Sequence, residues 1–104
     1  MKLLYTIAPY TAPTHNEVYR NIQSARIMAE HYWKLGYAVI CPHLNSAFMS
    51  GLLPEADFLS GTLLMMKKCD LVAVHPNYQS STGSIHEVLV AKKRNMEILY
   101  YGKE

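Results

Sequence analysis

The chain has 104 residues, of which half are hydrophobic and 17% are charged, a composition that fits one globular core. Its net charge is +2 and its basic residues are scattered apart from short runs at 67–68 and 92–94. This balance argues against a nucleic-acid-binding protein and leaves room for a phosphate-sized ligand. Residues 3–8, the first element, form a short apolar run that predicts a buried strand.

The next element is an amphipathic helix. Thr14, with Glu17 three residues later, has the form of a capping box. Apolar residues then recur at spacings of three and four for about five turns. Gly36 ends the pattern, as a glycine after a helix commonly does.

A second strand is predicted at residues 37–41, followed by a loop at 42–53. Pro54 suits the first turn of a second helix, and Lys67 and Lys68 suit its C-terminal end. No apolar run is long enough to cross a membrane, and we expect no signal peptide.

The remaining elements are a strand at 71–74, a helix at 85–94 and a strand at 96–101. Apolar strands that alternate with helices predict an α/β fold. We expect a small doubly wound (flavodoxin- or Rossmann-like) parallel sheet of four to five strands, with helices on both faces. Residues 1–104 are expected to form a single domain.

Ligands of doubly wound proteins bind beyond the carboxyl ends of the strands, where polar loops follow each of the first three strands here. Tyr10, in the first loop, and Tyr5, close to it, could stack on a base or sugar, although Tyr5 could equally belong to the core. His43 and Asn45, in the second loop, could bind or polarise a substrate or could simply shape the loop.

The third loop ends in "SSTGS", residues 80–84, before the predicted helix. Backbone N–H groups, hydroxyls and the positive end of a helix dipole would hold a phosphate there. A plain loop-to-helix cap is the alternative, because the segment lacks the full phosphate-binding loop motif. The candidate contacts are Ser80, Ser81, Thr82, Gly83 and Ser84.

Glu87 is a lone carboxylate in the first turn of the helix predicted at 85–94. It follows Ser84 by three residues, so the two could form a capping box. Alternatively, a carboxylate at the ligand edge could attack an electrophilic carbon such as the anomeric carbon of a ribose. The spacing allows both interpretations.

Neither histidines nor cysteines show metal-binding spacing, so no metal and no cofactor are expected. Cys41 and Cys69 each lie beside an apolar run and form no disulfide framework. We expect both to be reduced core thiols in a cytoplasmic protein.

Four segments together resemble the nucleoside 2-deoxyribosyltransferase-like superfamily, especially its short, poorly characterised members from bacteria and phages. The segments are "YTIAPYTA", "GYAVICPHLN", "FLSGTLLMMKKCDLVAV" and "SSTGSIHEVLVAKKRNMEILYY", and they span nearly the whole chain in the right order. The resemblance implies a Rossmann-like enzyme acting on a small-molecule nucleoside or nucleotide, without a nucleic acid polymer or membrane as partner. It also implies a homodimer or higher homo-oligomer.

In that superfamily a Glu on the helix after the third strand is the nucleophile, and the matching residue here is Glu87. The resemblance implies base exchange by a transferase, or base release by an N-glycosidase (a hydrolase), through a glycosyl-enzyme intermediate. Tyr10, His43 and Asn45 would line the pocket, and Ser81, Gly83 and Ser84 would contact sugar or phosphate.

One departure from the superfamily concerns an acid that assists the leaving base. Close relatives carry Asp in "G-D-L", where this chain has Gly61-Thr62-Leu63. Asp57 lies five residues earlier, about 140° around the helix from Thr62, and cannot simply replace it. The second hypothesis is therefore a catalytically impaired nucleotide-binding protein, a sensor or sequestering protein that keeps the pocket. A domain whose role is assembly is the third.

Overall fold

The computed structural model describes residues 1–103. Four strands alternate with helices along the chain, as the apolar pattern predicts, and two short helical segments lie in the loops. The elements are β1 (Leu3–Ile7), α1 (His15–Lys34), β2 (Ala38–Ile40), α2 (Pro42–Asn45), α3 (Glu55–Lys67), β3 (Leu71–Val74), the 3-10 turn η1 (Tyr78–Ser80), α4 (Thr82–Lys93) and β4 (Glu97–Tyr100).

The strands form one parallel sheet in the order β2-β1-β3-β4, which confirms the doubly wound α/β fold. The chain leaves β1 toward β2 and then returns past β1 to β3, so the order reverses between β1 and β3. Tyr5 lies at this position, in register with Ile40 on one side and Val72 on the other. Such a reversal is where ligands bind in this class of fold.

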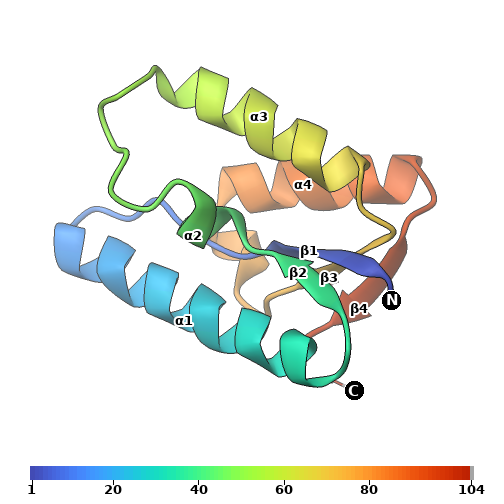
Figure 1. Ribbon diagram of the computed structural model, residues 1–104. Helices are drawn as coiled ribbons and strands as arrows, with labels where there is room; N and C mark the ends of the chain where they lie inside the picture. Colours follow the sequence, from blue (N-terminus) through green and yellow to red (C-terminus); the bar gives the residue numbers. More distant parts are fainter. Residues whose placement is uncertain (104) are drawn as a thin grey trace.

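The helices form a layer on each face of the sheet (Figure 1). Helix α1 covers one face, and α3 with α4 covers the other. Buried side chains alternate between the two layers, because successive residues of a strand point to opposite faces. The core under α1 contains Leu4, Met28, Tyr32, Leu71 and Ala73, whereas the core under α3 and α4 contains Tyr5, Ile7, Met66, Cys69, Val72, Val74, Val88 and Ala91.

One local and one long-range hydrogen bond hold the first helix and the first strand in place. Thr14 is the N-cap of α1, and its hydroxyl accepts from the Glu17 N–H at 3.1 Å, as the capping pattern predicts. Asp70, just before β3, accepts from the Leu3 N–H at 2.7 Å. This bond joins the start of the central strand β1 to that of its neighbour.

Helix α4 starts earlier than the sequence pattern predicts. It begins at Thr82 instead of residue 85, and its N-cap is Ser81, whose hydroxyl accepts from the Ser84 N–H at 3.2 Å. The prediction was wrong because hydroxyl residues and glycine resemble a loop, yet the same residues can cap and open a helix. Glu87 therefore lies in the second turn, and a capping box between Ser84 and Glu87 does not form.

The segment predicted as a loop at 42–53 is also partly helical, since α2 occupies Pro42–Asn45. Proline at the first position starts this short turn, although the sequence pattern treats it only as a strand terminator. Cys41 and Cys69 are both buried free thiols, as expected. Within residues 1–103, no helix combines the length and apolar character that crossing a membrane requires.

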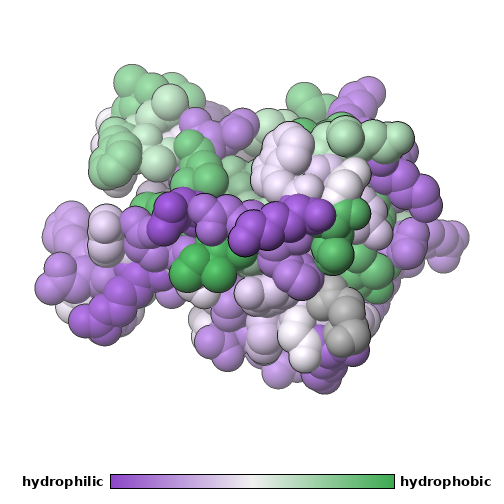
Figure 2. Space-filling model, turned by 60° about the horizontal axis from the view of Figure 1, so that its bottom comes forward, coloured by the Kyte–Doolittle hydropathy of each residue, from purple (hydrophilic) through white to green (hydrophobic). Residues whose placement is uncertain are grey.

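Exposed apolar side chains gather between α2 and α3. Phe48 is 94% exposed and has a positive φ of 67°, a conformation that costs a bulky residue free energy. Figure 2, which brings the α1 side forward, shows apolar surface at its upper left, at the end of the molecule where this segment lies. We call it the 44–53 apolar surface; its members are Leu44, Phe48, Met49, Leu52 and Leu53.

Candidate active site

A carboxylate and a phenol meet above the centre of the sheet. The Tyr5 hydroxyl, on β1, donates to Glu87 Oε2, on α4, at 2.5 Å. This length is typical of a charge-assisted bond from a hydroxyl to a carboxylate. Among residues 1–103, Glu87 Oε1 has no hydrogen-bond partner. One oxygen is therefore held in place while the other is available to a ligand.

The surroundings of Glu87 disfavour its charged form. Burial raises its pKa from 4.5 to about 7, and the hydrogen bond from Tyr5 opposes part of this rise. Tyr5 itself is fully buried. Its pKa is raised by burial and by the neighbouring Glu87 charge, so the proton of the pair stays on the phenol.

Glu87 lines a cavity of about 230 Å³ between α3 and α4. The first turn of α4 borders this cavity with Thr82 and Gly83, next to the carboxyl edge of the sheet. A Cβ at Gly83 would make only ordinary contacts, so glycine is not required there by space. We call this cavity the Glu87 hollow; its lining is Leu59, Thr62, Leu63, Thr82, Gly83, His86 and Glu87.

Thr62, which lies on α3, lies between two cavities. It lines the Glu87 hollow and also a second cavity of about 250 Å³. Its hydroxyl donates to the Leu59 carbonyl at 3.1 Å, within its own helix, so that proton is already engaged. We call the second cavity the Asp57 hollow; its lining is Asn45, Ser46, Asp57, Phe58, Gly61, Thr62 and Met65.

The other site residues expected from the sequence are divided among separate places. Asn45 lies in the Asp57 hollow, and its amide contacts the Met65 sulfur at 3.4 Å. Tyr10 and His43 line neither hollow and pack on each other, with ring centroids 5.4 Å apart. Ser81 belongs to the α4 cap, as described above.

His43 connects α2 to the segment after β1. It is 4% exposed, and its Nε2 lies 2.9 Å from the Pro9 carbonyl. A carbonyl can only accept, so Nε2 carries the proton in this bond. Burial lowers the pKa of His43, which favours the neutral ring. These contacts place His43 in the supporting structure beside the cavities.

The hydroxyls of the 80–84 segment also differ in what they can offer. Ser80 donates to the Asn77 carbonyl at 2.8 Å, and Ser84 is buried. Thr82 is exposed and lines the Glu87 hollow. Of this segment, Thr82 and Gly83 thus border the cavity directly.

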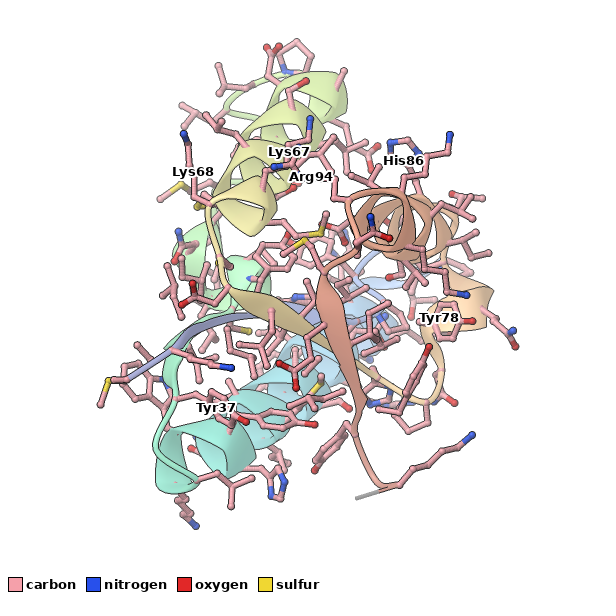
Figure 3. All side chains as sticks on the ribbon, turned by 90° about the vertical axis from the view of Figure 1, so that its right-hand side faces the viewer. Tyr37, Lys67, Lys68, Tyr78, His86 and Arg94 are labelled. Atoms are coloured by element: carbon pink, nitrogen blue, oxygen red, sulfur yellow. The ribbon has the colours of Figure 1, made fainter. Side chains whose placement is uncertain are left out.

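Basic side chains lie at the opposite end of the same helices. Figure 3 shows Lys67 and Lys68 at the end of α3 and Arg94 just after α4, facing the viewer together. His86, also labelled there, lies nearer the start of α4 and lines the Glu87 hollow. A phosphate in that hollow would therefore meet backbone N–H groups, Thr82 and His86, with the lysines at the far end.

Two contributors to this site were missed by the sequence analysis. The sequence indicates Tyr5 only as a stacking or core residue, and the spacing of the histidines, His86 among them, bears only on metal binding. A usable signal for Tyr5 existed, because a phenol inside a fully buried strand needs a hydrogen-bond partner. The partner is 82 residues away and depends on strand order, which the sequence pattern does not give. Within residues 1–103, no three His, Cys, Asp or Glu side chains gather closely enough to hold a metal ion.

Comparisons with known proteins agree with this architecture. A family model described as a domain of unknown function (DUF4406) matches residues 15–100. The structure is similar to that of a 2-deoxyribosyltransferase from the psychrotolerant bacterium Bacillus psychrosaccharolyticus, with a TM-score of 0.65 at 16% identity. That match covers 94% of this chain and 70% of the other, and it confirms the expected Rossmann-like fold. Among curated proteins, none matches the sequence.

Proposed function

This chain belongs to the DUF4406 family, and from that premise we propose that it breaks the N-glycosidic bond of a nucleoside or nucleotide. The observation that carries the proposal is Glu87, which lines a hollow and has one oxygen held by Tyr5, while the other oxygen has no partner among the described residues. The 2-deoxyribosyltransferase fold supports a nucleoside as the ligand class. The neighbouring helix start at Thr82 and Gly83 supports contact with sugar hydroxyls or a 5′-phosphate.

The chemistry follows from the two oxygens of Glu87. Oε1 attacks C1′ of the sugar as the C1′–N bond breaks, and the bonding electrons leave with the base. A glycosyl ester on Glu87 results. Water or a second base then attacks C1′ and loses a proton to solvent, and Glu87 departs as a carboxylate. Tyr5 keeps its hydrogen bond to Oε2 throughout, so it orients the carboxylate while Oε1 remains able to attack.

The departing base needs a proton. Thr62 has no acidic group, and its hydroxyl proton is engaged within α3. Among residues 1–103, the one other titratable side chain that lines the Glu87 hollow is His86. We propose that His86 or water supplies this proton. Because no carboxylic acid is placed to do so, we expect base release to be slow.

The direct test is base release. The protein is incubated with deoxynucleosides, ribonucleosides and their 5′-monophosphates, and free base is measured by chromatography. A second base added to the mixture separates transfer from hydrolysis, because transfer yields a new nucleoside. The proposal predicts release from part of the panel, together with a glycosyl adduct on Glu87 detectable by mass spectrometry after rapid acid quenching. Absence of release from every compound would overturn it.

The raised pKa of the buried Glu87 gives the reaction a defined pH dependence. Because Glu87 must be deprotonated to attack, base release by the native protein should rise with pH around 7 and level off above it. Tyr5→Phe removes the bond that lowers the Glu87 pKa, so the midpoint should move to higher pH by about one unit.

The measurement is the rate of base release between pH 5.5 and 9.5. Tyr78→Phe is the matched control, since the Tyr78 hydroxyl contacts Gln79 and lies outside the lining of the Glu87 hollow. Its profile should coincide with the native one. An unchanged midpoint in Tyr5→Phe would contradict the orienting role of Tyr5.

A second candidate function is nucleotide binding without turnover, as in a sensor or sequestering protein. The observation that favours it is Thr62, which leaves the hollow without the acid expected from the superfamily. This candidate predicts thermal stabilisation by a nucleoside or nucleotide without base release. The same panel therefore distinguishes the two functions.

We also propose that the protein forms a homo-oligomer through the 44–53 apolar surface. A second copy would bury Phe48, whose side chain is 94% exposed to water in a monomer. Phe48→Asp should weaken self-association in sedimentation equilibrium. The control is Trp33→Asp, at the C-terminal end of α1, where the side chain is about half exposed and lies outside the 44–53 apolar surface. This variant should self-associate like the native protein. Equal effects of the two substitutions would contradict the assignment. The free thiols fit the reducing cytoplasm as the location.

A further inference from the structure

The Asp57 hollow has the composition of a site for a flat heteroaromatic ring. Phe58 and Met65 offer apolar and aromatic surface, and Asn45 and Asp57 offer polar groups. Aromatic rings and thioethers pack well against planar ligands. The hollow shares Thr62 with the Glu87 hollow, so the two cavities adjoin at this residue.

The carboxylate of Asp57 is available to such a ligand. Among residues 1–103, it makes no ion pair and no side-chain hydrogen bond. It precedes Thr62 by five residues, which places it about 7.5 Å away along the helix axis and about 140° around it. Asp57 and Thr62 nevertheless both line the Asp57 hollow, so a ligand held there can contact both residues.

An ionised carboxylate offers two acceptors and no donor. Its best partner has two adjacent N–H donors, which it binds through two parallel charge-assisted bonds. Among the common bases, guanine has this pattern, on N1 and the 2-amino group. Adenine and cytosine place an acceptor beside their amino group, and hypoxanthine has the N1 donor alone. The amide of Asn45, with both donor and acceptor, can serve the O6 or N7 acceptors of the same base.

We propose that Asp57 determines specificity and selects guanine nucleosides or nucleotides as the substrates of this site. The inference rests on the proposed function, which it deepens by naming the base. Asp57 contacts the base at a distance from the bond that breaks, so its effect lies in discrimination among substrates. It does not restore the missing acid at Thr62.

The test compares deoxyguanosine with deoxyinosine, which differ only in the 2-amino group. The native protein should prefer deoxyguanosine by about tenfold or more in kcat/KM for base release. Asp57→Ala should abolish this preference. Asp57→Asn presents one acceptor and one donor, a pattern that matches the N6 donor and N1 acceptor of adenine. This variant should lose the deoxyguanosine preference and gain activity on deoxyadenosine.

Glu55→Gln is the matched control, because Glu55 is an exposed carboxylate on the same helix that lines neither hollow. It should keep the native preference. If the protein binds without turnover, the same preference is measured as Kd by calorimetry with the same nucleosides. Release or binding that is equal for deoxyguanosine and deoxyinosine overturns the inference and leaves the proposed function standing. Neither release nor binding with any nucleoside or monophosphate overturns both.

Discussion

Glu87→Gln is expected to reduce base release by at least about 10³-fold, because the amide cannot form the glycosyl intermediate. Glutamine has the same shape and can still accept the hydrogen bond from Tyr5, so the hollow should keep its form. Chromatography of free base, run on the most active compound of the panel, measures the loss. The glycosyl adduct should disappear at the same time.

The matched control is Glu30→Gln on α1. Glu30 forms an exposed ion pair with Arg26, and such pairs contribute little to stability. Its base release should equal that of the native protein. Substantial release by the Glu87→Gln variant would show that water attacks the sugar directly or that another residue is the nucleophile.

The same substitution should stabilise the protein at alkaline pH. The folded protein holds a proton on Glu87 up to pH about 7, whereas the unfolded chain releases it near 4.5. Between these values the unfolded chain binds fewer protons, so the free energy of unfolding falls as pH rises. The carboxylate therefore costs about 3 kcal/mol above pH 7, a cost that glutamine does not carry.

Urea unfolding at several pH values between 4.5 and 8.5 measures this effect. The difference in unfolding free energy between Glu87→Gln and the native protein should grow with pH toward about 3 kcal/mol. Differences between the two proteins isolate Glu87, because the other carboxylates titrate in both. A difference that stays constant over the whole range would contradict the raised pKa. Loss of activity together with gain of stability marks a residue kept for function.

The order and limits of most elements followed from the sequence. Apolar runs placed all four strands within about one residue of their observed limits, because strands buried on both faces tolerate few polar residues. Thr14 and Gly36 placed the limits of α1, since caps have local chemical requirements. The start of α4 and the presence of α2 could not be predicted from the sequence. Their residues, Ser81 to Ser84 and Pro42 to Asn45, are equally common in loops.

The candidate site followed only in part. Glu87 and Gly83 were expected at a ligand edge and do line a hollow there. Tyr10 and His43, expected beside them, pack on each other instead. The sequence pattern tells which helix or strand a residue belongs to. The order of the strands and the packing of the helices on the sheet decide which side chains come into contact. Tyr5 and Glu87 therefore could not be paired before the order β2-β1-β3-β4 was known.

The bond between Tyr5 and Glu87 joins residues near the two ends of the described chain, 82 positions apart. Contacts of such long range require closure of a loop that includes most of the chain. In the unfolded chain Glu87 is therefore an ordinary solvated carboxylate without a partner that orients it. A positioned nucleophile exists only when β1 and α4 are packed together, so the reactivity proposed here is a property of the whole assembled sheet.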